Sequence, residues 1–151
     1  MAGFRLSDDE VWAFVTDAHT GVMTTLRRDG SPVALPLWFA VVDRAIYTRT
    51  RGKKLARIAN DARASFLVES GEKWGELKAV HLNGTAAIIQ ADAELTAAID
   101  AEMQRKYAAF RTPTSKMPAA TVQHYATSMQ MVRFVPEGKV LSWDNAKLLQ
   151  G

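Results

Sequence analysis

The residues from Tyr47 to Lys54, YTRTRGKK, bring together two threonine hydroxyls, two arginines and two lysines. They fall where a predicted strand ends and a predicted helix begins, so the free amides of the first helical turn point to the same place. Phosphate groups are bound by charge-assisted hydrogen bonds from donors of this kind. The segment therefore indicates a phosphate site. Because side chains alternate along a strand, a solvated strand end whose charges point apart is the alternative.

A second candidate is Pro36-Leu37-Trp38-Phe39, where a proline and two aromatic residues share one predicted strand. Such a strand can form a wall against a flat ring system, although aromatic residues on strands more often belong to a core. Pro36 donates no hydrogen bond to a ladder, so it predicts an edge, a bulge or an interruption that faces a ligand.

Residues of the usual catalytic and metal-binding motifs are missing. The chain has no cysteine, and its three histidines, His19, His81 and His124, are far apart and have no cluster of carboxylates beside them. Thiolate nucleophiles, thiolate zinc sites and iron–sulfur clusters are thereby excluded. We expect no metal site and assign no catalytic residue. Haem ligation by His81 or His124 is a minor alternative.

Composition places the chain among ordinary globular proteins. It has 151 residues, of which 48% are hydrophobic and 23% charged, which is typical of one soluble domain. The net charge of +3 suits an anionic ligand but is too small to indicate nucleic acid. No apolar run is long enough to span a bilayer, and the N-terminus lacks a secretory signal, so we expect a cytoplasmic protein without a membrane partner.

The elements that must position these residues are mostly strands. Ser7 and Glu10 fit a capping box, Asp29-Gly30 predicts a hairpin turn, and Gly84 predicts a bulge or close approach. The predicted helices are 7–17, 53–60, 92–110 and 119–126. The predicted strands are 20–26, 32–42, 45–50, 64–69 and 77–89, followed by a closing hairpin of 130–135 and 139–143 that turns around Pro136-Glu137-Gly138. Without βαβ alternation, this order favours a small antiparallel barrel decorated by helices.

The ordered set of segments resembles a known superfamily. A hairpin is followed by PLWF, YTRTRGKK, a short helix, ASFLVE, a tryptophan and LKAVHLNGTA. Over residues 7–145 this order resembles the pyridoxamine 5'-phosphate oxidase-like FMN-binding split barrels, and within them the probable coenzyme F420-dependent oxidoreductases. The resemblance implies a mainly β (α+β) fold, a six- to seven-stranded antiparallel split β-barrel decorated by short helices. It also implies a single domain over 1–151 and a homodimer with the cofactor at its interface.

The same resemblance assigns a cofactor site, for either FMN or the deazaflavin F420. The ring would lie along residues 36–39, the ribityl chain along 47–50, and the phosphate against Lys53 and Lys54, with Arg57 extending the positive field. Trp143 would come from the partner chain or the rim. The implied cofactor-binding residues are Pro36, Leu37, Trp38, Phe39, Tyr47, Thr48, Arg49, Thr50, Lys53, Lys54, Arg57 and Trp143.

One departure bears on activity. Lys78-Ala79 stands where true pyridoxamine phosphate oxidases carry an Arg-Gln pair, which argues against vitamin B6 oxidation. The resemblance therefore predicts a flavin- or deazaflavin-dependent oxidoreductase that transfers hydride to or from a small organic substrate. The alternative is a protein that binds or stores FMN, F420 or haem without turnover. A nucleic-acid-binding barrel is disfavoured because the chain has no basic stripe.

Overall fold

One curled antiparallel sheet organises the protein. The computed structural model describes residues 3–125 and 128–150. Its helices are α1 (Asp8–Asp17), α2 (Lys53–Asn60), α3 (Ala93–Tyr107) and α4 (Ala119–Tyr125). Its strands are β1 (Gly21–Leu26), β2 (Pro32–Leu37), β3 (Ala40–Val42), β4 (Ala45–Thr50), β5 (Arg63–Ser70), β6 (Lys78–Ile89), β7 (Gln130–Pro136) and β8 (Leu141–Asp144).

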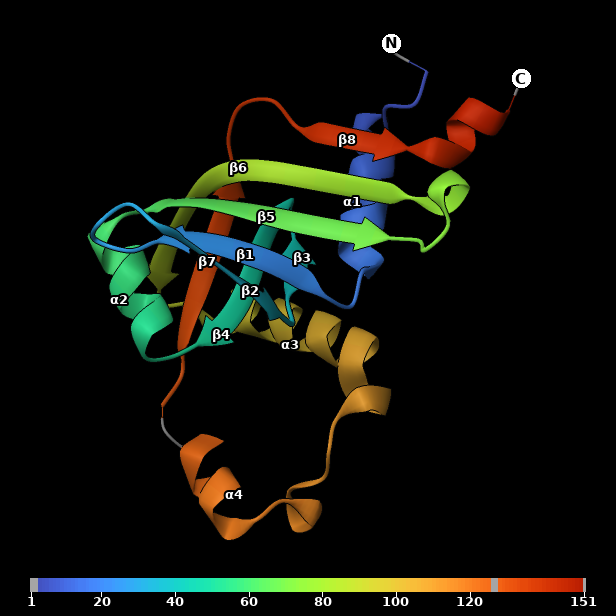
Figure 1. Cartoon of the computed structure of the whole chain (residues 1–151). Coiled ribbons are helices and arrows are strands. Elements are labelled where there is room, and N and C mark those ends of the chain that lie inside the picture. Colours follow the sequence, from blue (N-terminus) through green and yellow to red (C-terminus); the bar gives the residue numbers. More distant parts are fainter. Residues whose placement is uncertain (1–2, 126–127, 151) are drawn as a thin grey trace.

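The strand order is β2-β1-β5-β6-β7-β4-β3, with β8 pairing off this path to β6, and every pairing is antiparallel. The sheet curls so that its two edge strands, β2 and β3, follow each other in the chain and are joined only by Trp38 and Phe39 (Figure 1). The predicted α+β fold, a barrel left open between two edges, is confirmed. No helix within residues 3–125 and 128–150 is both long and apolar enough to cross a lipid bilayer.

The local signals at the start of the chain are confirmed. The Ser7 side chain accepts from the Glu10 amide while the Glu10 side chain accepts from the Ser7 amide, so the predicted capping box begins α1. The β1–β2 hairpin turns at Asp29 and Gly30, where Gly30 has a φ of 84°. The Asp29 carboxylate accepts from the Ser31 amide at 2.9 Å, which closes the turn.

The single strand predicted over 32–42 is wrong. It is two strands, and the break lies at Trp38 and Phe39. Pro36 stays in register opposite Val22 on β2, which is an edge strand, so the edge that Pro36 predicts is confirmed. The strand breaks at Trp38 and Phe39 because side chains, rather than a neighbouring strand, form hydrogen bonds with the backbone of these two residues. Phe39 N donates to the Tyr107 hydroxyl, and the Trp38 carbonyl accepts from a threonine hydroxyl of β4.

The closing hairpin predicted around 136–138 is also wrong, because β7 and β8 do not pair with each other. Both pair with β6 in the same direction, β7 with residues 84–89 and β8 with residues 78–81. The Glu137 amide donates to the Asn83 carbonyl between them. The segment between the two strands, with Gly138 at a φ of 76°, is therefore a bulge along one long strand edge rather than a reversal.

The two later helices differ slightly from their predicted ranges. The helix predicted to reach residue 110 ends at Tyr107 and continues as a 3₁₀ turn, Ala108–Phe110. The helix predicted over 119–126 is α4, and its predicted last residue, Ala126, lies outside the described residues. Between them the chain leaves the barrel, and α4 lies well below it in Figure 1.

The core fills the curl of the sheet. Phe66 packs edge-on against Phe39, with ring centroids 4.8 Å apart, and against Phe134 at 6.0 Å; all three are fully buried. Smaller apolar clusters lie beneath the two helices that cover the sheet, with Ile58 from α2 and Ile99 from α3 at their centres. Both helices are thus fixed relative to the strands that they cover.

Candidate functional site

A narrow cleft lies at the opening of the barrel, between the β1–β2 hairpin on one side and β4 with α2 on the other. The empty space between its walls is about 300 Å³ when the open solvent at its mouth is included, but the centre of a water molecule can reach only about 10 Å³ of it. Its walls are Met23, Thr25, Val33, Leu35, Leu37, Thr48, Thr50, Lys54, Arg57, Ile58 and Val132.

One end of the cleft is basic. Lys54 and Arg57 line it together with the buried hydroxyls of Thr25 and Thr50. Arg57 Nε donates to Thr25 Oγ1 at 3.0 Å. Burial lowers the pKa of Lys54, and the nearby Arg57 lowers it further. Since none of the lining residues is acidic, two like charges face this end without a counter-charge, which is an arrangement suited to an anion.

The rest of the cleft is an apolar wall. Leu35 and Leu37 of β2 face Met23 of β1 along the hairpin. At the far end from the basic pair, Thr48 lines the cleft and donates its hydroxyl to the Trp38 carbonyl at 2.8 Å. The cleft thus combines an anion-binding end with a surface suited to the body of an elongated, largely apolar molecule.

Strand and helix periods explain how these side chains converge. On β4 the residues Thr48 and Thr50 share one face because side chains alternate. On α2, Lys54, Arg57 and Ile58 lie three and four residues apart and therefore share a helix face. Gly52, with a φ of 70°, makes the sharp entry from β4 into α2, and no side chain caps this helix.

Five of the predicted site residues meet in the cleft: Leu37, Thr48, Thr50, Lys54 and Arg57. Tyr47 and Arg49 do not, because they lie on the opposite face of β4. Tyr47 is buried among residues beneath α3. The Arg49 guanidinium lies 2.7 Å from the Asp100 carboxylate of α3.

The other predicted residues are also placed outside the lining. Pro36 is exposed on β2, and Lys53 is exposed at the first position of α2. Trp38 is 40% exposed and stacks on Tyr107, whereas Phe39 is in the core. Trp143 is half-buried on β8, opposite Ala79 of β6. The structure does not bring these five residues together with the basic pair.

Residues of the hairpin that line the cleft were missed. Met23 and Thr25 on β1, and Val33 and Leu35 on β2, carry no chemical motif. The signal that finds them is the Asp29-Gly30 turn together with strand alternation, which places these pairs on the face that they share with Leu37.

The end of α3 holds the linker between β2 and β3. Lys106 is 4% exposed, and its ammonium donates to the Phe39 carbonyl at 2.7 Å while lying 3.6 Å from the centre of the Phe39 ring. The Tyr107 hydroxyl accepts from Phe39 N at 3.0 Å and donates to the His19 carbonyl at 2.9 Å. These long-range bonds fix both backbone polar groups of Phe39.

The buried ammonium of Lys106 should make stability depend on pH. Burial lowers its pKa from 10.5 to about 8, Arg105 adds to the effect, and Glu102 and Asp17 oppose it. From about pH 8 upward the unfolded state binds more protons, so the free energy of unfolding rises with pH. Between about pH 7 and about pH 9 we expect the wild type to gain roughly 1 kcal/mol relative to Lys106→Met. Urea unfolding of both proteins at the two pH values measures this, and equal changes in both would contradict it.

Comparison with known proteins gives a family and a set of folds. The sequence profile of the family described as "Pyridoxamine 5'-phosphate oxidase" matches residues 7–135. Among curated proteins, none matches this chain. The crystal structure of a conserved hypothetical protein from Mycobacterium tuberculosis is similar at 29% identity and a TM-score of 0.79, over 98% of this chain and 91% of that one.

Two further structures share the fold at lower identity. A FAD-binding protein from Mesorhizobium loti has 19% identity and a TM-score of 0.68, over 94% of this chain and 96% of its own. The haem storage protein HutZ from Vibrio cholerae has 13% identity and a TM-score of 0.65, over 90% of this chain and 94% of its own. One fold thus serves proteins described by different ligands.

Proposed function

This chain belongs to the pyridoxamine 5'-phosphate oxidase family, and from that membership we propose that its cleft binds a phosphorylated flavin or deazaflavin and that the protein is an oxidoreductase acting on a small organic substrate. The observation that carries the proposal is the basic end of the cleft, where Lys54 and Arg57 face an acid-free pocket that continues as an apolar wall.

The residues present fit such a cofactor. A phosphate needs charged donors and hydroxyls, and Lys54, Arg57, Thr25 and Thr50 provide them at one end. A tricyclic ring needs an apolar surface, which the hairpin side chains that line the cleft provide. FMN and the deazaflavin F420 both have this combination of a phosphate and a flat ring. The proposal therefore includes both.

When bound, the cofactor would supply the hydride chemistry, and the chain would supply binding, orientation and electrostatics. Lys54 and Arg57 would hold the phosphate. Their positive charge would favour an anionic cofactor over a neutral one. No residue of the wall is titratable, so we assign no proton donor to this chain.

Vitamin B6 is not the proposed substrate. The glutamine that the family's namesake oxidases use is replaced by Ala79, and the preceding Lys78 lies at the start of β6 with its ammonium 4.6 Å from the centre of the Phe14 ring. Lys78 is not among the residues that line the cleft.

A second candidate function is cofactor binding or storage without turnover. The observation that favours it is the same wall, which offers no acid or base to a substrate. Reduction of the loaded protein by substrate or by an external reductant distinguishes the two. A bound cofactor that exchanges no electrons with either would favour storage.

A paired titration of the apoprotein with FMN and with F420, followed by cofactor fluorescence at fixed salt, tests the proposal. We expect saturable binding of at least one, displaced by excess inorganic phosphate or weakened by high salt because the basic pair carries the affinity. Binding of neither compound would overturn the proposed function.

We further propose a homodimer with the cofactor at its interface, to which the partner would contribute Trp143. The segment from Ala108 to His124 supports a dimer, because nearly all of its residues are exposed and it extends away from the barrel (Figure 1). Phe110 is 60% exposed and Val122 is 37% exposed on this segment. Apolar side chains on an extended arm are typical of a contact with another chain.

Replacing Phe110 and Val122 together by serine is therefore expected to shift the protein toward monomer. Sedimentation velocity over a range of concentrations measures the change, and we expect the dissociation constant of the dimer to rise by about ten-fold or more, since two buried apolar side chains are lost from the interface. Lys116→Ser, an exposed polar position on the same arm, is the matched control. A wild type that sediments as a monomer would contradict the dimer.

A further inference from the structure

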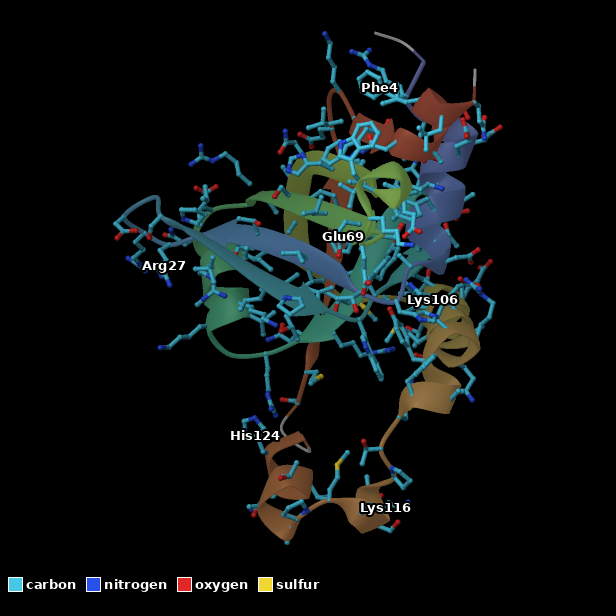
Figure 2. All side chains as sticks on the ribbon, turned by 45° about the vertical axis from the view of Figure 1, so that its right-hand side comes forward. Phe4, Arg27, Glu69, Lys106, Lys116 and His124 are labelled. Atoms are coloured by element: carbon cyan, nitrogen blue, oxygen red, sulfur yellow. The ribbon has the colours of Figure 1, made fainter. Side chains whose placement is uncertain are left out.

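We propose that Lys106 and Tyr107 are positioning residues of the cleft: they hold the Trp38–Phe39 linker in place and so set the wall against which the cofactor ring lies. The inference rests on the proposed function, because it concerns how the same cleft presents its apolar end. Figure 2 shows Lys106 on α3, at the opposite end of the sheet from the hairpin turn near Arg27.

The linker occupies a special place in the topology. β2 and β3 are the two edges of the open barrel, and Trp38 and Phe39 are the only residues between them in the chain. Three of the linker's backbone polar groups are bound by side chains rather than by a neighbouring strand, namely the Trp38 carbonyl, the Phe39 amide and the Phe39 carbonyl. The position of the linker therefore depends on those side chains.

A buried lysine such as Lys106 costs more free energy than packing alone would justify. It is buried, and among the described residues no carboxylate lies within ion-pair distance of its ammonium. Burial of a charge without such a partner costs free energy, which an apolar side chain of the same length would avoid. What the lysine gains is the bond to the Phe39 carbonyl and the contact with the face of the Phe39 ring.

Tyr107, the next residue of α3, also holds the linker. Its fully buried ring stacks on Trp38, with centroids 4.3 Å apart and planes at 8°, while its hydroxyl binds the Phe39 amide. The Phe39 side chain in turn packs on Phe66 in the core. Both linker side chains are thus fixed. The end of α3 supplies the contacts with the Trp38 ring and with the Phe39 backbone.

A shift of the linker would change the shape of the cleft only at its apolar end, where Leu37 and Thr48 lie. Thr48 lines the cleft and donates to the Trp38 carbonyl, and Leu37, the residue before the linker, lines it too. The basic end is about 13 Å away along the hairpin, since four residues separate Leu37 from Val33 and a strand rises about 3.3 Å per residue. Loss of the lysine or tyrosine contacts should therefore alter how the ring is held and leave phosphate binding intact.

Two conservative variants test this. Tyr107→Phe removes only the hydroxyl, and Lys106→Met keeps the length of the side chain but removes the ammonium. For each we expect the Kd for FMN to rise by about ten-fold, the affinity for inorganic phosphate, measured by competition, to stay within about two-fold, and the absorption spectrum and reduction potential of the bound flavin to change. If F420 is the cofactor that binds, it replaces FMN in the same measurements.

Two further variants serve as controls. Arg105→Gln removes surface ion pairs with Asp17 and Glu102 from the same turn of α3, and Ile99→Val loosens the core beneath the same helix without touching the linker. Both should leave the affinity and the spectrum of the bound flavin unchanged. Thermal unfolding of all four variants reports any loss of stability separately.

The outcomes separate the two proposals. If the wild type binds neither cofactor, the proposed function fails and this inference fails with it. If the wild type binds but Tyr107→Phe and Lys106→Met bind with unchanged affinity, spectrum and potential, only the inference is overturned. It is overturned as well if Ile99→Val changes the flavin spectrum as much as they do, because the effect would then be one of stability.

Discussion

Replacing Lys54 by methionine and Arg57 by glutamine in one protein is expected to weaken binding of the phosphorylated cofactor by about 100-fold. Each residue lines the basic end of the cleft, and no acidic residue there competes for them. A hydrogen bond to a charged group contributes roughly 1.5–3 kcal/mol, and two partly redundant bonds together give about 3 kcal/mol, or about 100-fold in Kd. Fluorescence titration of wild type and variant at the same ionic strength measures the ratio.

The control for this variant is Lys53→Met with Arg111→Gln, which makes the same changes of residue type at exposed positions outside the cleft. We expect the control to bind within about two- to three-fold of the wild type, because exposed charges are screened by salt. Riboflavin, which lacks the phosphate, should bind the wild type and the cleft variant about equally. Equal affinity of wild type and cleft variant for FMN and F420 would remove the phosphate assignment.

The two variants also test which lysine binds the phosphate, Lys53 or Lys54. The resemblance assigns the phosphate to Lys53 and Lys54, which are neighbours in the chain. Neighbouring residues on a helix point about 100° apart, and of these two only Lys54 lines the cleft. Arg57, one turn later, lines the cleft beside Lys54, so the proposed phosphate site uses Lys54 with Arg57.

Local patterns predicted the elements well, because the signals are carried by adjacent residues. The capping box at Ser7, the turn at Asp29-Gly30 and the range of α2 all depend on residues within a few positions of each other. Strand alternation also shows that Thr48 and Thr50 share a face. It does not show which face lines the cleft, and for this reason the predicted site includes Tyr47 and Arg49, which lie beneath or beside α3.

The errors have a common physical cause, which is competition from distant partners. The break at Trp38 and Phe39 depends on Lys106 and Tyr107, which lie 67 and 68 residues further along the chain. No sequence pattern near the linker predicts these contacts. Likewise, the Pro136-Glu137-Gly138 turn signal predicts a reversal, but the unpaired edge of the twelve-residue strand β6 accepts both flanking strands in one direction.

Gly84→Ala is expected to destabilise the protein by about 3 kcal/mol, although it adds only one methyl group. A Cβ at this position would lie 2.1 Å from the Val135 carbonyl oxygen and 3.0 Å from the Phe134 ring, so the backbone of β7 would have to move. Overpacking of this kind usually costs roughly 1–3 kcal/mol, and the clash with backbone places this site at the upper end. Urea unfolding measures the loss.

The matched control for Gly84→Ala is Gly75→Ala. Its Cβ would meet only the Leu149 side chain, which is 67% exposed and free to turn aside, so we expect a change within about 0.5 kcal/mol. A Gly84→Ala protein as stable as this control would contradict the close approach. The effect reaches beyond β6, because β7 pairs with β4 and contributes Val132 to the cleft. The close packing of β6 on β7 therefore depends on the absence of a side chain at Gly84, and a shift of β7 would be carried along that strand toward the cleft.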